Sequence, residues 1–172
     1  MKQIQHIMKP QDIVILLKII ALNKDDWQQK PLADALKISQ SEISQSVARS
    51  QYAGLMTGKR VMRMALMDFL QYGLTYAFPQ KPGVLVRGIP TAHTAAPLNN
   101  LIVSNEAYVW PWAKGKIRGQ GIVPLYSSVP EAAEQDKELY MLLALTDALR
   151  VGKAREKELA LKLLKERLVY GK

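Results

Sequence analysis

Polar side chains with hydrogen-bonding groups recur at helical spacing between residues 40 and 49, and their chemistry suits the recognition of nucleic-acid bases. They are Gln40, Ser41, Ser44, Gln45 and Arg49. We expect them to share the outward face of a helix whose inward face carries Ile43 and Val47. Glutamine can form two hydrogen bonds with adenine, arginine can form two with guanine, and serine suits a base edge or a phosphate. The spacing therefore favours base contacts in the major groove of double-stranded DNA.

A basic cluster follows these residues in the chain and contains Lys59, Arg60 and Arg63. Contacts from such side chains to the DNA backbone fix the register of a protein and supply much of its salt-dependent affinity. A solvated basic loop would have the same composition. The position of the cluster next to the 40–49 segment favours phosphate contacts.

A second polar segment, residues 87–94, combines Arg87, Thr91, His93 and Thr94 with a glycine and a proline that fix the backbone. These four side chains could bind an anion or a small metabolite. The alternative, which we favour, is a stiff loop whose hydroxyl groups satisfy its own turns.

The sequence does not predict an enzyme. It has no cysteine, no glycine-rich phosphate loop and no pair of histidines at metal-ligand spacing. Glu106 is the only acidic residue between Asp68 and Glu131, so the middle of the chain cannot supply a carboxylate pair. We therefore expect no catalytic residues, no cofactor and no metal site.

The elements that would position the first set of residues form a helix-turn-helix pattern at residues 31–56. Apolar residues three and four apart define a short first helix, and Ile38 fills the turn. Ser39 is the expected N-cap of the second helix, with Glu42 completing a capping box, and Gly54 is the expected C-cap. The alternative is that two short helices pack together and expose a solvated polar face.

Residues 10–56 resemble the helix-turn-helix core of the MarR-type winged-helix regulators of bacteria, over less than a third of the chain. The resemblance lies in a leading apolar helix at residues 13–22, an aromatic Trp27, and the stretches PLADALKIS and SQSEISQSVARSQYAGLM. It implies that the matching residues of the second helix face DNA, namely Gln40, Ser41, Ser44, Gln45 and Arg49. It also implies a homodimer.

The wing of such a fold should consist of two alternating strands around a glycine or asparagine turn. Residues 57–60, Thr-Gly-Lys-Arg, give the only turn signal after the second helix, and residues 61–72 have helical spacing. We therefore expect a reduced wing that is followed directly by a helix.

We expect an α+β fold that is mainly α. Residues 1–72 would form the winged-helix-like DNA-binding domain, residues 73–130 a small irregular β-containing module, and residues 131–172 a C-terminal helical region. Strands are expected at residues 74–78, 84–87, 101–103, 108–110 and 122–126, and helices at residues 136–151 and Ala154–Leu168.

The net charge of +9 is unevenly distributed, with +4 in each of the first two segments and +1 in the last. A positive field attracts polyanions. The first ten residues lack the apolar core of a signal peptide, and the longest apolar run, residues 13–17, is too short to span a bilayer. We therefore expect a cytoplasmic protein without membrane contact.

Three functions fit these features. The first is a sequence-specific, dimeric regulator of transcription. The second is a protein-interaction or antitoxin-like module, which would use the same scaffold to bind a protein partner. The third is a regulator whose middle module senses a small ligand. For the dimer, two amphipathic helices are expected to be available, at residues 4–22 and Ala154–Leu168. We expect a homodimer with a two-fold axis and an inverted-repeat operator, with the C-terminal helix contributing to the interface. The alternative is that this helix packs on its own domain.

Overall fold

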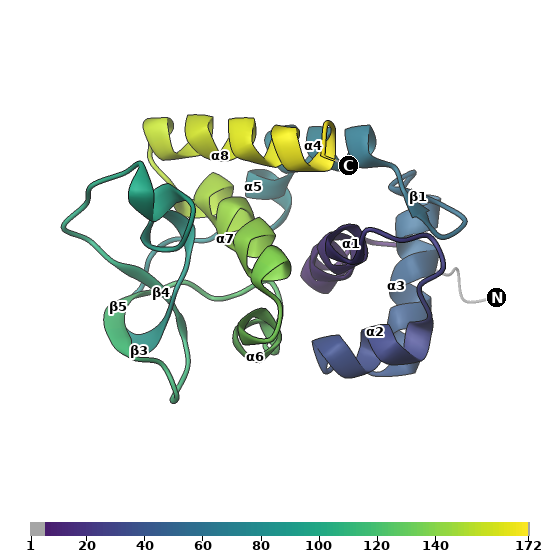
Figure 1. Cartoon of the computed structure of the whole chain (residues 1–172), viewed down its shortest axis with the longest axis horizontal. Helices are drawn as coiled ribbons and strands as arrows, with labels where there is room; N and C mark the ends of the chain where they lie inside the picture. Colours follow the sequence, from purple (N-terminus) through teal and green to yellow (C-terminus); the bar gives the residue numbers. More distant parts are fainter. Residues whose placement is uncertain (1–5, 172) are drawn as a thin grey trace.

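The computed structural model describes residues 6–171, which form a mainly helical α+β fold (Figure 1). Its α-helices are α1 (Pro10–Leu22), α2 (Gln29–Leu36), α3 (Gln40–Tyr52), α4 (Arg63–Tyr72), α5 (Leu74–Ala77), α6 (Val129–Glu134), α7 (Lys137–Val151) and α8 (Ala154–Leu168). Its strands are β1 (Met56–Thr57), β2 (Arg60–Val61), β3 (Leu85–Pro90), β4 (Tyr108–Pro111) and β5 (Ile117–Gly121), and two 3-10 turns are η1 (Ala92–Thr94) and η2 (Leu98–Asn100).

Helix α1 lies at the centre of the molecule. Figure 1 shows it end-on, with α2 and α3 on one side and α7 on the other, and it packs against both α3 and α7. Its residues from Asp12 to Ile20 are all buried, because apolar side chains occupy every side of the helix. Lys18 is the one lysine in this stretch, and its Nζ lies 2.6 Å from the Asp136 carboxylate at the start of α7.

The expectation that a helix at residues 4–22 is available for a dimer interface is wrong. Helix α1 begins only at Pro10, where the backbone N–H of Lys9 donates to Asp12 and caps the helix. Ile4 lies outside the described residues. The apolar surface of α1 is already covered by its own chain, so it is not available to a second copy.

Helices α2 and α3 are joined by a short turn. Lys37 adopts a left-handed conformation with φ 55° at the end of α2, and Ile38 is buried in the turn. Ser39 accepts a hydrogen bond from the Glu42 N–H and so caps α3, as expected. Gly54 follows α3 with φ +78°, a conformation that favours glycine.

A two-residue hairpin, β1–β2, stands where the reduced wing was expected. Thr57 pairs with Arg60, so the turn consists of Gly58 and Lys59. Gly58 has φ +58°, which a side chain would disfavour. Helix α4 begins two residues after β2, in agreement with the helical spacing of the sequence.

In the middle segment, strands β3, β4 and β5 close on themselves, with β3 antiparallel to both of the others and β4 parallel to β5. Glycines allow this close approach. A Cβ at Gly88 would overlap the Trp110 carbonyl oxygen, and one at Gly119 would lie 2.7 Å from the Ala107 carbonyl oxygen. The ring of strands therefore depends on glycine at these two positions.

Three of the five expected strands are wrong. Residues 74–77 form helix α5, which buries Leu74 and leaves Tyr76 exposed, so the short apolar run was misleading. Residues 101–103 and 122–126 contain no strand. The third strand of the sheet is β5, a polar, glycine-containing segment that pairs through its backbone and has no alternating apolar pattern.

The C-terminal helices complete the core. Helix α8 packs on α7 and α4, and Figure 1 shows it lying across one side of the molecule. The N-terminal, middle and C-terminal segments all contribute side chains to one hydrophobic cluster. Within residues 6–171, no helix is both long enough and apolar enough to cross a lipid bilayer.

Candidate nucleic-acid interface

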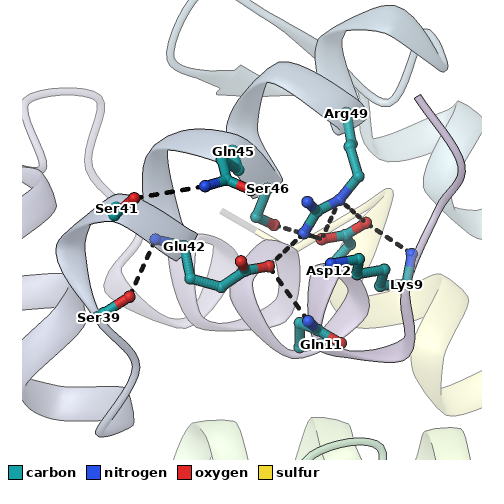
Figure 2. A network of polar contacts seen from close by, with 9 residues as sticks. All are labelled: Lys9, Gln11, Asp12, Ser39, Ser41, Glu42, Gln45, Ser46 and Arg49. Atoms are coloured by element: carbon teal, nitrogen blue, oxygen red, sulfur yellow. Dashed lines mark hydrogen bonds and ion pairs between the residues drawn. The ribbon is translucent and has the colours of Figure 1, made fainter. Parts of the chain in front are cut away.

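The outward face of α3 is polar, uncharged and accessible. Gln40, Ser41, Ser44 and Gln45 are all exposed, as expected. Gln45 donates to the Ser41 hydroxyl one turn earlier, across 3.3 Å (Figure 2). Ala48 continues this face with a small side chain. The face can therefore approach a surface closely and offer both donors and acceptors to it.

The expectation that Arg49 belongs to this face is wrong. Its side chain turns toward α1 (Figure 2), and the residue is only 6% exposed. Its Nη2 lies 2.7 Å from Asp12 Oδ1 and its Nε lies 3.0 Å from Asp12 Oδ2. The fork geometry of the guanidinium matches a carboxylate, so a buried partner captures it.

Asp12, in the first turn of α1, is the centre of this network and is completely buried. Besides these two bonds and a third of 3.2 Å from Arg49 Nε to its Oδ1, it accepts a bond of 2.6 Å from the Ser46 hydroxyl and one of 2.8 Å from the Lys9 N–H. A buried carboxylate is tolerated only when it is paired and hydrogen-bonded in this way. The network therefore fixes α3 on the N-terminal end of α1.

Glu42 also turns away from the outward face. Its Oε1 accepts a bond of 2.6 Å from Arg49 Nη2 and one of 3.1 Å from Gln11 Nε2. Burial raises the pKa of Glu42, but the hydrogen bonds from Arg49 and Gln11 outweigh it and bring the pKa below its ordinary value. The hydrogen bonds with Asp12 raise the pKa of Arg49.

The structure therefore corrects the expected capping box. Ser39 accepts from the Glu42 N–H, but the Glu42 side chain bonds to Arg49 and Gln11. This rearrangement has a useful electrostatic effect. The only acidic residue of α3 is directed at an arginine, and the exposed face of the helix carries no negative charge that would repel a phosphate.

The three basic residues after α3 lie together, and each has a contact within the chain. Lys59 Nζ donates to the Trp27 carbonyl oxygen across 2.8 Å, while Trp27 Nε1 donates to the Lys59 carbonyl oxygen across 2.9 Å. Arg60 forms an exposed ion pair of 3.0 Å with Asp25. Arg63 is half-buried, and its Nη1 donates to the Leu168 carbonyl oxygen across 3.3 Å. The exposed pair of Arg60 and Asp25 is weak and can be exchanged for a contact with phosphate.

The four expected ligand-binding residues of the middle segment do not act together. The Thr91 hydroxyl donates to the buried Asp147, His93 Nε2 lies 2.7 Å from the Glu106 carbonyl oxygen, and the Thr94 hydroxyl accepts from the Tyr108 N–H. Arg87 is exposed on β3. The hydroxyl groups therefore do not satisfy the turns of their own loop, as the alternative expected, but bond to α7 and β4 and fix the loop on these elements.

Sequence reasoning missed Asp12, Gln11 and Ser46 as parts of the site. A signal was present for Asp12, because it is the only acidic residue of α1 and an apolar run follows it directly. A charge at such a position requires a partner. The sequence did not indicate that this partner would be Arg49, 37 residues further along the chain.

The chain as a whole matches no protein-family model, no curated protein and no solved structure.

Proposed function

We propose that this protein is a sequence-specific, double-stranded-DNA-binding regulator of transcription, cytoplasmic and bacterial, with α3 as its recognition helix. One observation carries the proposal. The exposed face of α3 presents only uncharged hydrogen-bonding and small side chains, while the one acid of the helix is turned inward. The dimensions of the major groove of B-DNA admit an α-helix with such a face.

The exposed residues have the chemistry for reading bases. The amides of Gln40 and Gln45 can each form two hydrogen bonds with an adenine edge, and the hydroxyls of Ser41 and Ser44 suit a base or a phosphate. Ala48 leaves room for a thymine methyl group. Arg49 has no part in this reading face.

The buried network supports recognition indirectly. Arg49 connects α3 to Asp12 of α1 through three hydrogen bonds, and Ser46 adds a fourth. A helix that is held rigidly before binding loses little conformational entropy on contact with a ligand. The network therefore acts as a support that orients the reading face.

The hairpin would supply contacts to the DNA backbone. Lys59 and Arg60 are exposed at the tip of β1–β2, and Arg63 follows at the start of α4. Phosphate contacts give affinity without sequence preference. We therefore assign Lys59, Arg60 and Arg63 to phosphates, and Gln40, Ser41, Ser44 and Gln45 to bases.

We further propose a homodimer, because one recognition helix reads too few base pairs to specify a genomic site. The apolar stripe of α8, which we expected to contribute to the dimer interface, packs within its own chain, so we place the interface elsewhere. Met64 and Tyr72 of α4 and Tyr76 of α5 are large apolar side chains that remain exposed. Light scattering at micromolar concentration should give twice the mass of the chain, and a monomer in the presence of DNA would contradict this.

The experiment that tests DNA reading begins with selection of bound duplexes from a random pool by the purified full chain. Fluorescence anisotropy then compares Gln45→Ala with Gln71→Ala, which removes an exposed glutamine from α4. Gln45→Ala should cost about 1–3 kcal/mol on the selected duplex and far less on random DNA. Gln71→Ala should leave both affinities unchanged.

Two results would contradict the proposal. If no duplex sequence is enriched by the selection, the protein does not read DNA. If Gln45→Ala weakens the selected and random duplexes equally, α3 does not contact bases and the exposed face serves another purpose, such as binding a protein partner.

A further inference from the structure

A cavity of about 420 Å³ opens between the C-terminal end of α1, the β1–β2 hairpin and the start of α4. Its buried lining is apolar and includes Ile19 and Ile20. Four basic side chains also line it. They are Lys24, Lys59, Arg60 and Arg63. The volume falls within the range of small-molecule sites, and the lining combines apolar side chains with four positive charges.

The charges of this cavity are strongly unbalanced. Asp25 is the only acidic residue in its lining, against four basic ones. Asp25 pairs with Arg60, but the two side chains are 70% and 75% exposed, so solvent screens the pair and an anion can replace it. The C-terminal end of α1 lies here too and opposes an anion weakly. The basic side chains outweigh both effects.

Two of the basic side chains are already held in place. Lys59 uses one donor on the Trp27 carbonyl oxygen, and Arg63 uses one on the Leu168 carbonyl oxygen. A lysine ammonium has three donors and a guanidinium has five, so each keeps donors for a further acceptor. These two side chains therefore lose less conformational entropy when a ligand binds than freely moving side chains would.

We propose that this cavity is a phosphate-binding site. A phosphate group has several charged oxygens, and it can accept bonds from arginine and lysine side chains that approach from different directions. A carboxylate would engage fewer of the four. The excess of positive charge suits a ligand with more than one phosphate charge.

Two sources could supply this phosphate. One is the backbone of bound DNA, and that source rests on the proposed function. The other is a free phosphorylated small molecule, which does not depend on it. Because Lys59 and Arg60 are also the residues assigned to the DNA backbone, a free phosphorylated ligand in the cavity would compete with DNA for them.

Isothermal titration calorimetry of the full chain with sodium tripolyphosphate tests the site directly. The test variant is Lys24→Ala with Arg60→Ala, since both side chains are exposed and their removal leaves the core intact. It should bind tripolyphosphate about tenfold more weakly than the unaltered chain. Lys116→Ala, an exposed lysine near β5, is the matched control and should have no effect.

A gain of affinity gives a second, independent readout. Asp25→Asn removes the opposing charge and frees Arg60, so it should tighten tripolyphosphate binding about threefold. A general disturbance of the fold would not produce this increase. Gln45→Ala should leave tripolyphosphate binding unchanged, which separates this site from base reading by α3.

The source is decided by a duplex titration at several salt concentrations. If tripolyphosphate binds and displaces the duplex, the site accepts free phosphorylated molecules. If tripolyphosphate does not bind but Lys24→Ala lowers the salt slope of duplex binding by about one, the site holds a backbone phosphate. If tripolyphosphate binds and the double variant weakens that binding while the chain binds no duplex, the site still accepts free phosphorylated molecules and only the proposed function fails. If tripolyphosphate does not bind and Lys24→Ala leaves the salt slope unchanged, or if the double variant and Lys116→Ala bind tripolyphosphate like the unaltered chain, the proposal is overturned.

Discussion

At the scale of single residues, α3 contains side chains with two distinct roles. Those that point outward are free to contact a ligand, and those that point inward, Ser46 and Arg49 above all, bind the buried Asp12. The two sets alternate along one helix, so helical spacing alone assigned Arg49 to the wrong one. The buried carboxylate of Asp12 determines that the Arg49 side chain points inward.

Replacing Arg49 should therefore reduce stability. Arg49→Ala leaves the carboxylate of Asp12 buried without its charged partner, and we expect it to lower the free energy of unfolding by about 3–5 kcal/mol. Urea titration followed by circular dichroism measures this. Gln45→Ala, an exposed residue of the same helix, is the control and should change stability by less than about 0.5 kcal/mol.

A double substitution tests whether the loss comes from an unpaired charge. Asp12→Leu combined with Arg49→Met removes both charges and should recover part of the lost stability. If Arg49→Ala lowers the free energy of unfolding no more than Gln45→Ala does, the buried ion pair does not fix α3 on α1 when the protein is in solution.

The free energy of unfolding at acidic pH should also depend on this network. Because the folded-state pKa of Glu42 lies below its ordinary value of 4.5, Glu42 contributes stability that is complete above that value. This contribution is lost as the pH falls through the lower folded-state pKa. Urea titrations between about pH 6 and pH 3 should show a smaller loss of stability for Glu42→Gln than for the unaltered chain.

The exposed Glu131 of α6 provides the comparison for that experiment. Glu131→Gln removes an exposed carboxylate elsewhere in the fold, so it separates the effect at Glu42 from a general effect of losing one acidic side chain. Identical pH dependence in Glu42→Gln and the unaltered chain would show that the contact between Glu42 and Arg49 is not maintained.

At the scale of elements, the sequence predicted helices far better than strands. The limits of α8 agree with the expected range, and Ser39 caps α3 as expected, because caps and apolar stripes are local signals. At the other end the C-cap is Ala53, one residue before the expected Gly54, which follows it with a positive φ. Strand β5 has no local signal. It is polar and contains glycine, and its place is set by backbone pairing with β3.

The same contrast holds for the candidate site. The exposed residues of α3 followed from periodicity, whereas the inward turn of Arg49 and Glu42 depends on Asp12 and Gln11 of α1, which lie about 30 or more residues earlier in the chain. Contacts at this separation are determined by the packing of whole elements.

The closed sheet gives a prediction at this scale. Gly88→Ala places a Cβ on the Trp110 carbonyl oxygen, where backbone must shift, so we expect a loss of more than about 2 kcal/mol in the free energy of unfolding. Gly83→Ala is the matched control, because its Cβ would meet the nearest atom at 3.4 Å. Thermal unfolding of both variants measures the difference, and equal melting temperatures would contradict the tight closure of β3 on β4.

At the scale of the whole molecule, α1 and α8 connect the segments. Helix α1 packs against α3 and α7, and α8 packs against α4 and α7. All three segments thus contribute to one core. A change in the C-terminal helices is therefore expected to affect the stability of the N-terminal helices as well.

Removal of α8 tests this dependence. Ala160, Leu164 and Leu168 are completely buried, so a chain that ends at Val151 exposes its core and should unfold or aggregate. Size-exclusion chromatography with circular dichroism distinguishes this from a soluble, folded protein. A chain that ends at Val169 keeps α8 and is the control. A folded, soluble chain ending at Val151 would show that α8 is dispensable to the core.

The separation of outward and inward residues on α3 has an evolutionary consequence. Gln40, Ser41, Ser44 and Gln45 are exposed, so most substitutions there should leave the free energy of unfolding within about 0.5 kcal/mol of its original value. Mutation can therefore diversify these four positions without loss of the fold, and selection can act on what the face recognises. A library randomised at these four codons should consist largely of folded proteins, and it offers a scaffold for engineering new specificities.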